Sequence, residues 1–82
     1  MDKPERRPSE VIEAILKHVP EDKVILRRYL LGIREDSFYT PPESMVEIWV
    51  RIGLTLKAYL SSPPTLDYEI RIGQIVRGEA TD

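Results

Sequence analysis

Apolar residues recur along most of this chain at the three- and four-residue spacings of amphipathic helices. The clearest stripe lies in residues 9–19, where the apolar positions are Val11, Ile12, Ile15, Leu16 and Val19. Ser9 stands where an N-cap is expected, and the proline after Val19 disfavours a continued helix. We therefore predict a first helix over residues 9–19.

A second helix is predicted over residues 21–31. Acidic residues suit its first turn, and Gly32 offers a left-handed stop. Its apolar positions surround nearly the whole circumference instead of forming one stripe. A helix of this kind either lies centrally in a bundle or presents a second apolar face to a partner chain. Residues 32–39 then form the predicted linker.

The longest apolar segment covers residues 40–60 and contains the only tryptophan, Trp49. Thr40 and Glu43 have the Thr-x-x-Glu spacing of a capping box, and a proline follows the threonine directly, where the first turn of a helix accepts it. These signals predict a third helix over residues 41–60.

The C-terminal half of the chain fits both a helical and a strand pattern. A fourth helix is predicted over residues 65–77, with Gly78 as its cap. Alternation of apolar and polar residues instead favours a long β-hairpin with strands 46–60 and 66–76. Strands rarely run so long, and such a hairpin needs further layers to be stable. The preferred fold class is all-α, a small four-helix domain; the alternative is α+β, two N-terminal helices plus the hairpin.

The composition indicates one small ordered domain. The chain has 82 residues, of which 41% are hydrophobic and 32% charged, as in ordered soluble proteins. A chain this short buries only a thin core, and without cysteine it has no disulfides to supplement that core. We therefore expect self-association. A flexible arm is predicted for residues 1–8 and a frayed end for residues 79–82, around a compact domain 9–78.

The charge and the motifs exclude several function classes. A net charge of −2 argues against a dedicated nucleic-acid binder. The N-terminus does not resemble a signal peptide, and no apolar run approaches the roughly 18 residues of a membrane span, which predicts a cytoplasmic protein. His18 is the only histidine, and we find no metal-ligand spacing, phosphate loop or nucleophile motif. We expect neither an enzyme nor a cofactor.

The first functional hypothesis is a small non-enzymatic protein-interaction or regulatory module. It would self-associate and dock on a larger protein of unknown identity. Aromatic and arginine side chains dominate such interfaces, and the candidate partner-binding residues of these types are Arg27, Arg28, Tyr29, Trp49 and Tyr59. A short, cysteine-free, acidic chain is also typical of the products of small accessory or mobile-element genes, which include inhibitors that bind one host protein.

The alternative hypothesis is nucleic-acid or nucleotide binding through Arg27, Arg28 and Arg34, with Tyr29 as a stacking surface. It rests on the clustering of five of the twelve basic residues between Lys17 and Arg34. Binding of this kind would weaken as salt rises, because phosphate contacts release counterions.

Overall fold

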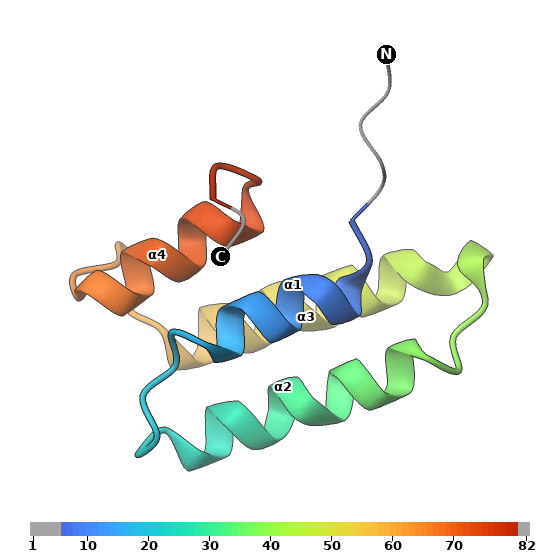
Figure 1. Cartoon of the computed structure of the whole chain (residues 1–82), viewed down its shortest axis with the longest axis horizontal. Coiled ribbons are helices and arrows are strands. Elements are labelled where there is room, and N and C mark those ends of the chain that lie inside the picture. Colours follow the sequence, from blue (N-terminus) through green and yellow to red (C-terminus); the bar gives the residue numbers. More distant parts are fainter. Residues whose placement is uncertain (1–5, 81–82) are drawn as a thin grey trace.

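The computed structural model describes residues 6–80 and contains four α-helices in that range (Figure 1). The elements are α1 Pro8–Leu16, α2 Val24–Ser37, a 3-10 turn η1 Pro42–Ser44, α3 Met45–Tyr59 and α4 Asp67–Val76. The all-α prediction is confirmed. The predicted flexible arm 1–8 and frayed end 79–82 lie partly outside the described residues.

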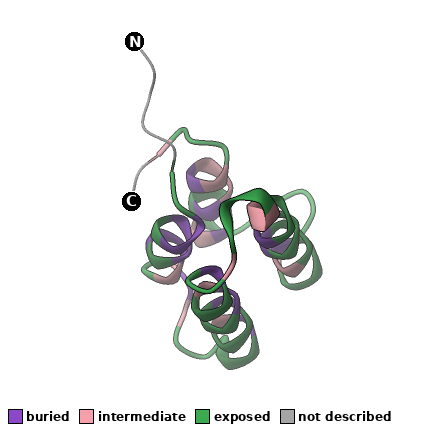
Figure 2. Cartoon of the chain, turned by 90° about the vertical axis from the view of Figure 1, so that its right-hand side faces the viewer, coloured by how far each residue is buried: buried purple, intermediate pink, exposed green. Residues whose placement is uncertain are grey.

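The helices run alternately up and down around one core. α2 packs against both α1 and α3, and α4 packs against α1. Seen nearly end-on, the helices turn their buried sides toward one another and their exposed sides outward (Figure 2). All four contribute the largest fully buried side chains, which are Ile12, Ile15, Leu30, Ile52, Ile72 and Ile75. The core is therefore almost entirely aliphatic.

The β-hairpin alternative is wrong. Both of its proposed strands, 46–60 and 66–76, are largely helical, and no strand occurs between residues 6 and 80. α3 buries Ile48, Ile52 and Leu56, which are four residues apart, as one face of a helix requires. The strand pattern arises because apolar residues also fill the positions between these three, and in α3 those side chains lie exposed.

α1 is shorter than the predicted helix 9–19 and begins one residue earlier, at Pro8. Ser9 is not the N-cap, because the proline takes the first helical position and Ser9 is buried in the first turn. Beyond Leu16 the chain tightens into a turn with a hydrogen bond between residues three apart. Val19 nevertheless remains buried. The predicted apolar residue therefore still packs in the core, although the helix ends before it.

α2 begins and ends later than the predicted helix 21–31, and the predicted linker 32–39 is mostly helical. Gly32 lies inside the helix and is not its stop. Its cost, about 1 kcal/mol relative to alanine, is smaller than the roughly 1.5–3 kcal/mol that burial of one large aliphatic side chain contributes. Ile33, directly after Gly32, is such a buried residue, so packing overrides the local stop signal.

α3 fits the predicted helix 41–60 closely, but its start differs. The predicted capping box is wrong, because no side-chain cap hydrogen bond forms at the start of η1 or α3. Instead, the Thr40 hydroxyl donates to the backbone carbonyl of Asp36 at 2.8 Å. Thr40 therefore secures the end of α2, and prolines alone shape the entry into α3.

α4 lies within the predicted helix 65–77 and ends with the predicted glycine cap. Gly78 has φ +80°, the left-handed conformation that favours glycine. Its N–H donates to Ile75 O at 3.1 Å, and the Glu79 N–H donates to Gln74 O at 2.8 Å. Together these bonds form a Schellman motif, which satisfies carbonyls at the end of α4.

The loop from α3 to α4 is organised around the buried carboxylate of Glu69. Its two oxygens accept backbone N–H bonds from Ser61 at 2.7 Å and from Thr65 and Leu66 at 3.1 Å each. These bonds, led by the one from Ser61, lower the pKa of Glu69 to about 2 against the opposing effect of burial. Glu69 is therefore ionised at neutral pH and holds the loop in place.

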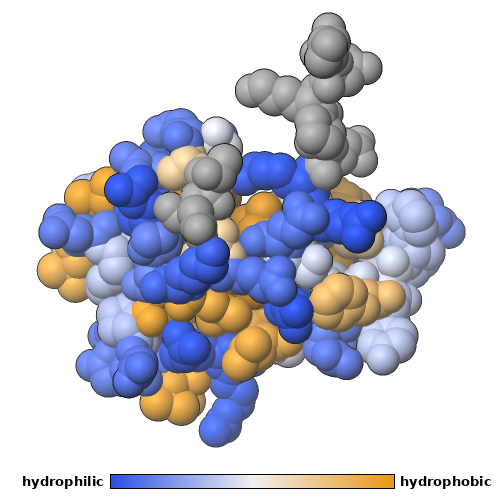
Figure 3. All heavy atoms as spheres, viewed as in Figure 1, coloured by the Kyte–Doolittle hydropathy of each residue, from blue (hydrophilic) through white to orange (hydrophobic). Residues whose placement is uncertain are grey.

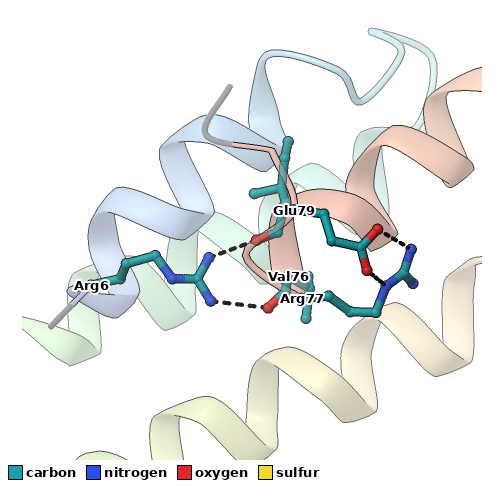
Figure 4. A network of polar contacts seen from close by, with 5 residues as sticks. Arg6, Val76, Arg77 and Glu79 are labelled. Carbon is teal, nitrogen blue, oxygen red and sulfur yellow. Dashed lines mark hydrogen bonds and ion pairs between the residues drawn. The ribbon is translucent and has the colours of Figure 1, made fainter. Parts of the chain in front are cut away.

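Arg6 ties the N-terminal segment to the far end of the chain (Figure 4). Its guanidinium donates to Ile75 O at 2.6 Å and to Val76 O at 3.0 Å, at the C-terminus of α4. Beside it, Arg77 and Glu79 form an ion pair at 2.6 Å. The negative end of the α4 dipole also stabilises the Arg6 cation at this position.

Candidate functional site

The outward sides of α2 and α3 carry most of the exposed apolar surface. Twelve large hydrophobic side chains are exposed among residues 6–80, and eight belong to these two helices: Val24, Ile25, Tyr29, Leu31, Val46, Val50, Leu54 and Tyr59. Along the lower edge of the molecule, where α2 lies, apolar side chains alternate with charged ones (Figure 3). This surface is the candidate functional site.

Two tyrosines join the helices at one end of the surface. The rings of Tyr29 on α2 and Tyr59 on α3 have centroids 5.7 Å apart and are tilted by 34°, a favourable arrangement for aromatic pairs. Partial burial, followed by the nearby Tyr29 hydroxyl, raises the pKa of Tyr59 above its ordinary value. Both side chains are exposed, by 54% for Tyr29 and 44% for Tyr59, so the pair presents aromatic surface to a partner.

A groove of about 360 Å³ runs beside Tyr29 and is lined by Ile25, Arg28, Gly32, Glu35, Asp36 and Arg51. An ion pair at 3.0 Å between Arg51 on α3 and Asp36 on α2 fixes the two helices at its rim. The rim carries both charge signs, and the floor is partly apolar. We call this feature, with the two tyrosines, the α2–α3 groove.

The five predicted partner-binding residues do not form a single surface. Arg28, Tyr29 and Tyr59 come together at the α2–α3 groove. Arg27 faces α1, where its guanidinium donates to the carbonyls of Leu16 and Val19, both at 3.2 Å. It caps the end of α1, which is a structural task.

Trp49 also lies away from the groove. Its side chain is half-buried and packs against the core. It borders a hollow together with Arg7, Pro8, Pro42 and others at the start of α1. The tryptophan therefore contributes mainly to packing between α3 and the N-terminal segment.

The three arginines of the nucleic-acid alternative are not gathered into one open basic patch. Arg34 pairs with Glu13 of α1 at 2.8 Å and lies 5.1 Å from the centre of the Phe38 ring. Arg27 donates to one carbonyl at the end of α1 and to one in the turn that follows it. Of the three, Arg28 is the one whose side chain has no hydrogen bond or ion pair to another described residue.

The sequence interpretation missed the apolar ridge on the outside of α3. Val46, Val50 and Leu54 follow one another at four-residue intervals, and 65%, 53% and 61% of their surfaces are exposed. Val50 and Leu54 are the residues that do not fit the core face of the predicted third helix. Their regular spacing is the signal that could have identified a second apolar face.

No group of three or more metal-ligating side chains occurs within residues 6–80. Over the same range, no helix has the length and apolar character needed to cross a bilayer. Comparisons with protein-family models, curated proteins and solved structures each found no match.

Proposed function

We propose that this chain is a small non-enzymatic protein-interaction module that docks on a larger protein through the α2–α3 groove and also self-associates. The observation that carries the proposal is the amount of exposed apolar surface. Twelve large hydrophobic side chains lie exposed, against thirteen buried hydrophobic residues, among those described. Soluble monomers rarely leave large contiguous apolar patches uncovered. A surface of this kind favours binding of another polypeptide.

The chemistry of the α2–α3 groove supports a protein partner. Tyrosine, arginine and isoleucine side chains supply large contact areas, and tyrosine and arginine are enriched at interaction hot spots. Arg28 has no partner of its own in the described chain and is exposed, so it is available to an acidic group. Nucleic-acid binding is the weaker proposal, because the guanidinium groups of Arg27 and Arg34 are already engaged.

Site-specific photo-crosslinking in the native host tests docking. A benzophenone amino acid is placed at Ile25 in the groove and, as the control, at Arg71, which is exposed on α4. We expect a discrete protein adduct from position 25 that is absent from position 71 and is lost when Arg28→Glu is added. Equal products from both positions, or none from position 25, would contradict docking through this groove.

The regulatory role, the inhibitor role of an accessory or mobile-element product, and the cytoplasmic location stay predictions. Identification of the adduct by mass spectrometry addresses the first two, because it names the protein on which the module acts. The interaction with a larger protein and the self-association are independent parts of the proposal, and separate measurements test them.

A further inference from the structure

We propose that α3 is a homodimerisation helix, which pairs antiparallel with α3 of a second copy about a twofold axis level with Ile52. The inference rests on the self-association in the proposed function and names the surface that carries it. The contact surface, here called the outer face of α3, consists of Val46, Glu47, Val50, Gly53, Leu54, Lys57 and Ala58. All of these residues are exposed.

The outer face has the layout of a helix-pairing surface. Its ridge of Val46, Val50 and Leu54 lies opposite the buried side of α3, which Ile48 and Ile52 occupy. Four-residue ridges of this kind interdigitate when helices pack. A Cβ placed on Gly53, close to the proposed axis, would meet no atom within 4 Å. With no side chain at that position, two helices can approach closely there.

The charges on this face are complementary to a second copy in one register. When the Ile52 residues of the two copies lie at the same level, antiparallel pairing places Glu47 opposite Lys57, Val50 opposite Leu54 and Val46 opposite Ala58. Twofold symmetry repeats each contact, because such an interface presents the same surface from both copies. The apolar ridge is thus covered by the partner's ridge, and an acid–base pair lies at each end of it.

Parallel pairing in register places Glu47 opposite Glu47 and Lys57 opposite Lys57, which brings like charges together. Neither side chain has a hydrogen bond or ion pair with any other residue between 6 and 80. Both charges are therefore available to a partner. The self-complementarity of the face identifies that partner as a second copy of this chain.

A charge-exchange experiment on the whole chain tests the register. Glu47→Lys alone, or Lys57→Glu alone, places like charges at both ends of the ridge, so we expect each to raise the dimer dissociation constant by about tenfold or more. An equimolar mixture of the two variants restores both opposite-charge contacts and should form a heterodimer. Sedimentation equilibrium over micromolar to millimolar concentrations measures each case, and circular dichroism confirms that each variant folds.

Glu43 is the matched control, since it lies in η1 before α3 begins. Glu43→Lys should leave the dimer unchanged and should not associate with Lys57→Glu any better than the wild type does. A monomeric wild-type chain overturns the proposal, as does a dimer that neither single charge reversal weakens. The Ile52 register is overturned if the mixture of Glu47→Lys and Lys57→Glu does not associate. It is also overturned if Glu43→Lys restores association with Lys57→Glu. None of these results affects crosslinking from Ile25, so docking on a larger protein is judged separately.

Discussion

Replacement of Gly32 by alanine is expected to stabilise the protein. Gly32 lies inside α2, and a Cβ added to it would meet no atom within 4 Å. Its φ is not positive, because Gly78 is the positive-φ glycine of the described chain. Alanine therefore fits the folded backbone without strain, while it restricts the unfolded chain.

The expected gain is about 0.5–1 kcal/mol in the free energy of unfolding, the penalty of glycine relative to alanine in a helix interior. For a domain of this size, 1 kcal/mol corresponds to a shift of about 4–8 °C in Tm. The wild type and Gly32→Ala should therefore differ by several degrees in thermal unfolding followed by circular dichroism. Urea unfolding at one protein concentration supplies the free-energy difference and avoids a contribution from association.

Gly78→Ala is the matched control and should shift stability the other way. At φ +80° a side chain costs roughly 1–2 kcal/mol, and the Schellman bonds at the end of α4 depend on that conformation. If Gly32→Ala destabilised the protein as Gly78→Ala does, Gly32 would have to be a left-handed stop. The continuation of α2 to Ser37 would then be refuted.

Three further outcomes concern the core and the polar contacts. Glu69→Gln should lower the stability to urea at pH 7. The difference from the wild type should fade as the pH drops from 4.5 toward 2, because a carboxyl whose folded pKa is lowered to about 2 stabilises the fold only while it is ionised. An undiminished difference at pH 2 would oppose this. Ile72→Ala should cost about 2–5 kcal/mol in urea unfolding, with Ile72→Val at about 0.5–1.5 kcal/mol; equal effects would argue against full burial. Arg27→Met should speed amide hydrogen exchange in residues 17–19 while α4 stays protected, and unchanged exchange there would contradict its capping role.

Features set by one face of one helix could be predicted from the sequence. Three such features are the apolar face of α1, the extent of α3 and the Gly78 cap of α4. Each depends on residues a few positions apart, so periodicity and turn chemistry are enough to predict it. Gly32 shows where this fails. Its local stop signal is weaker than the burial of Ile33, and that burial depends on helices distant in sequence.

The candidate site was predictable only in part, for the same reason. Tyr29 and Tyr59 are 30 positions apart, and their pairing depends on how α2 and α3 pack. The tasks of Arg27 and Arg34 depend on α1, which the sequence pattern does not place beside them. The apolar positions of α3 could be identified in the sequence. Taken together, however, the apolar residues of its two faces alternate with polar ones as in a strand. The helical structure shows which of them lie in the core and which lie on the outer surface.

The bond from Arg6 to the end of α4 also decides where this protein can be attached to something else. It brings the two ends of the described chain together on the α1–α4 side of the bundle, away from α2 (Figure 1). A label or fusion partner joined before Arg6 or after Ala80 is therefore attached on the side of the bundle opposite α2, and the α2–α3 groove stays open. Two modules fused head to tail through a flexible linker would likewise keep both α2–α3 grooves exposed.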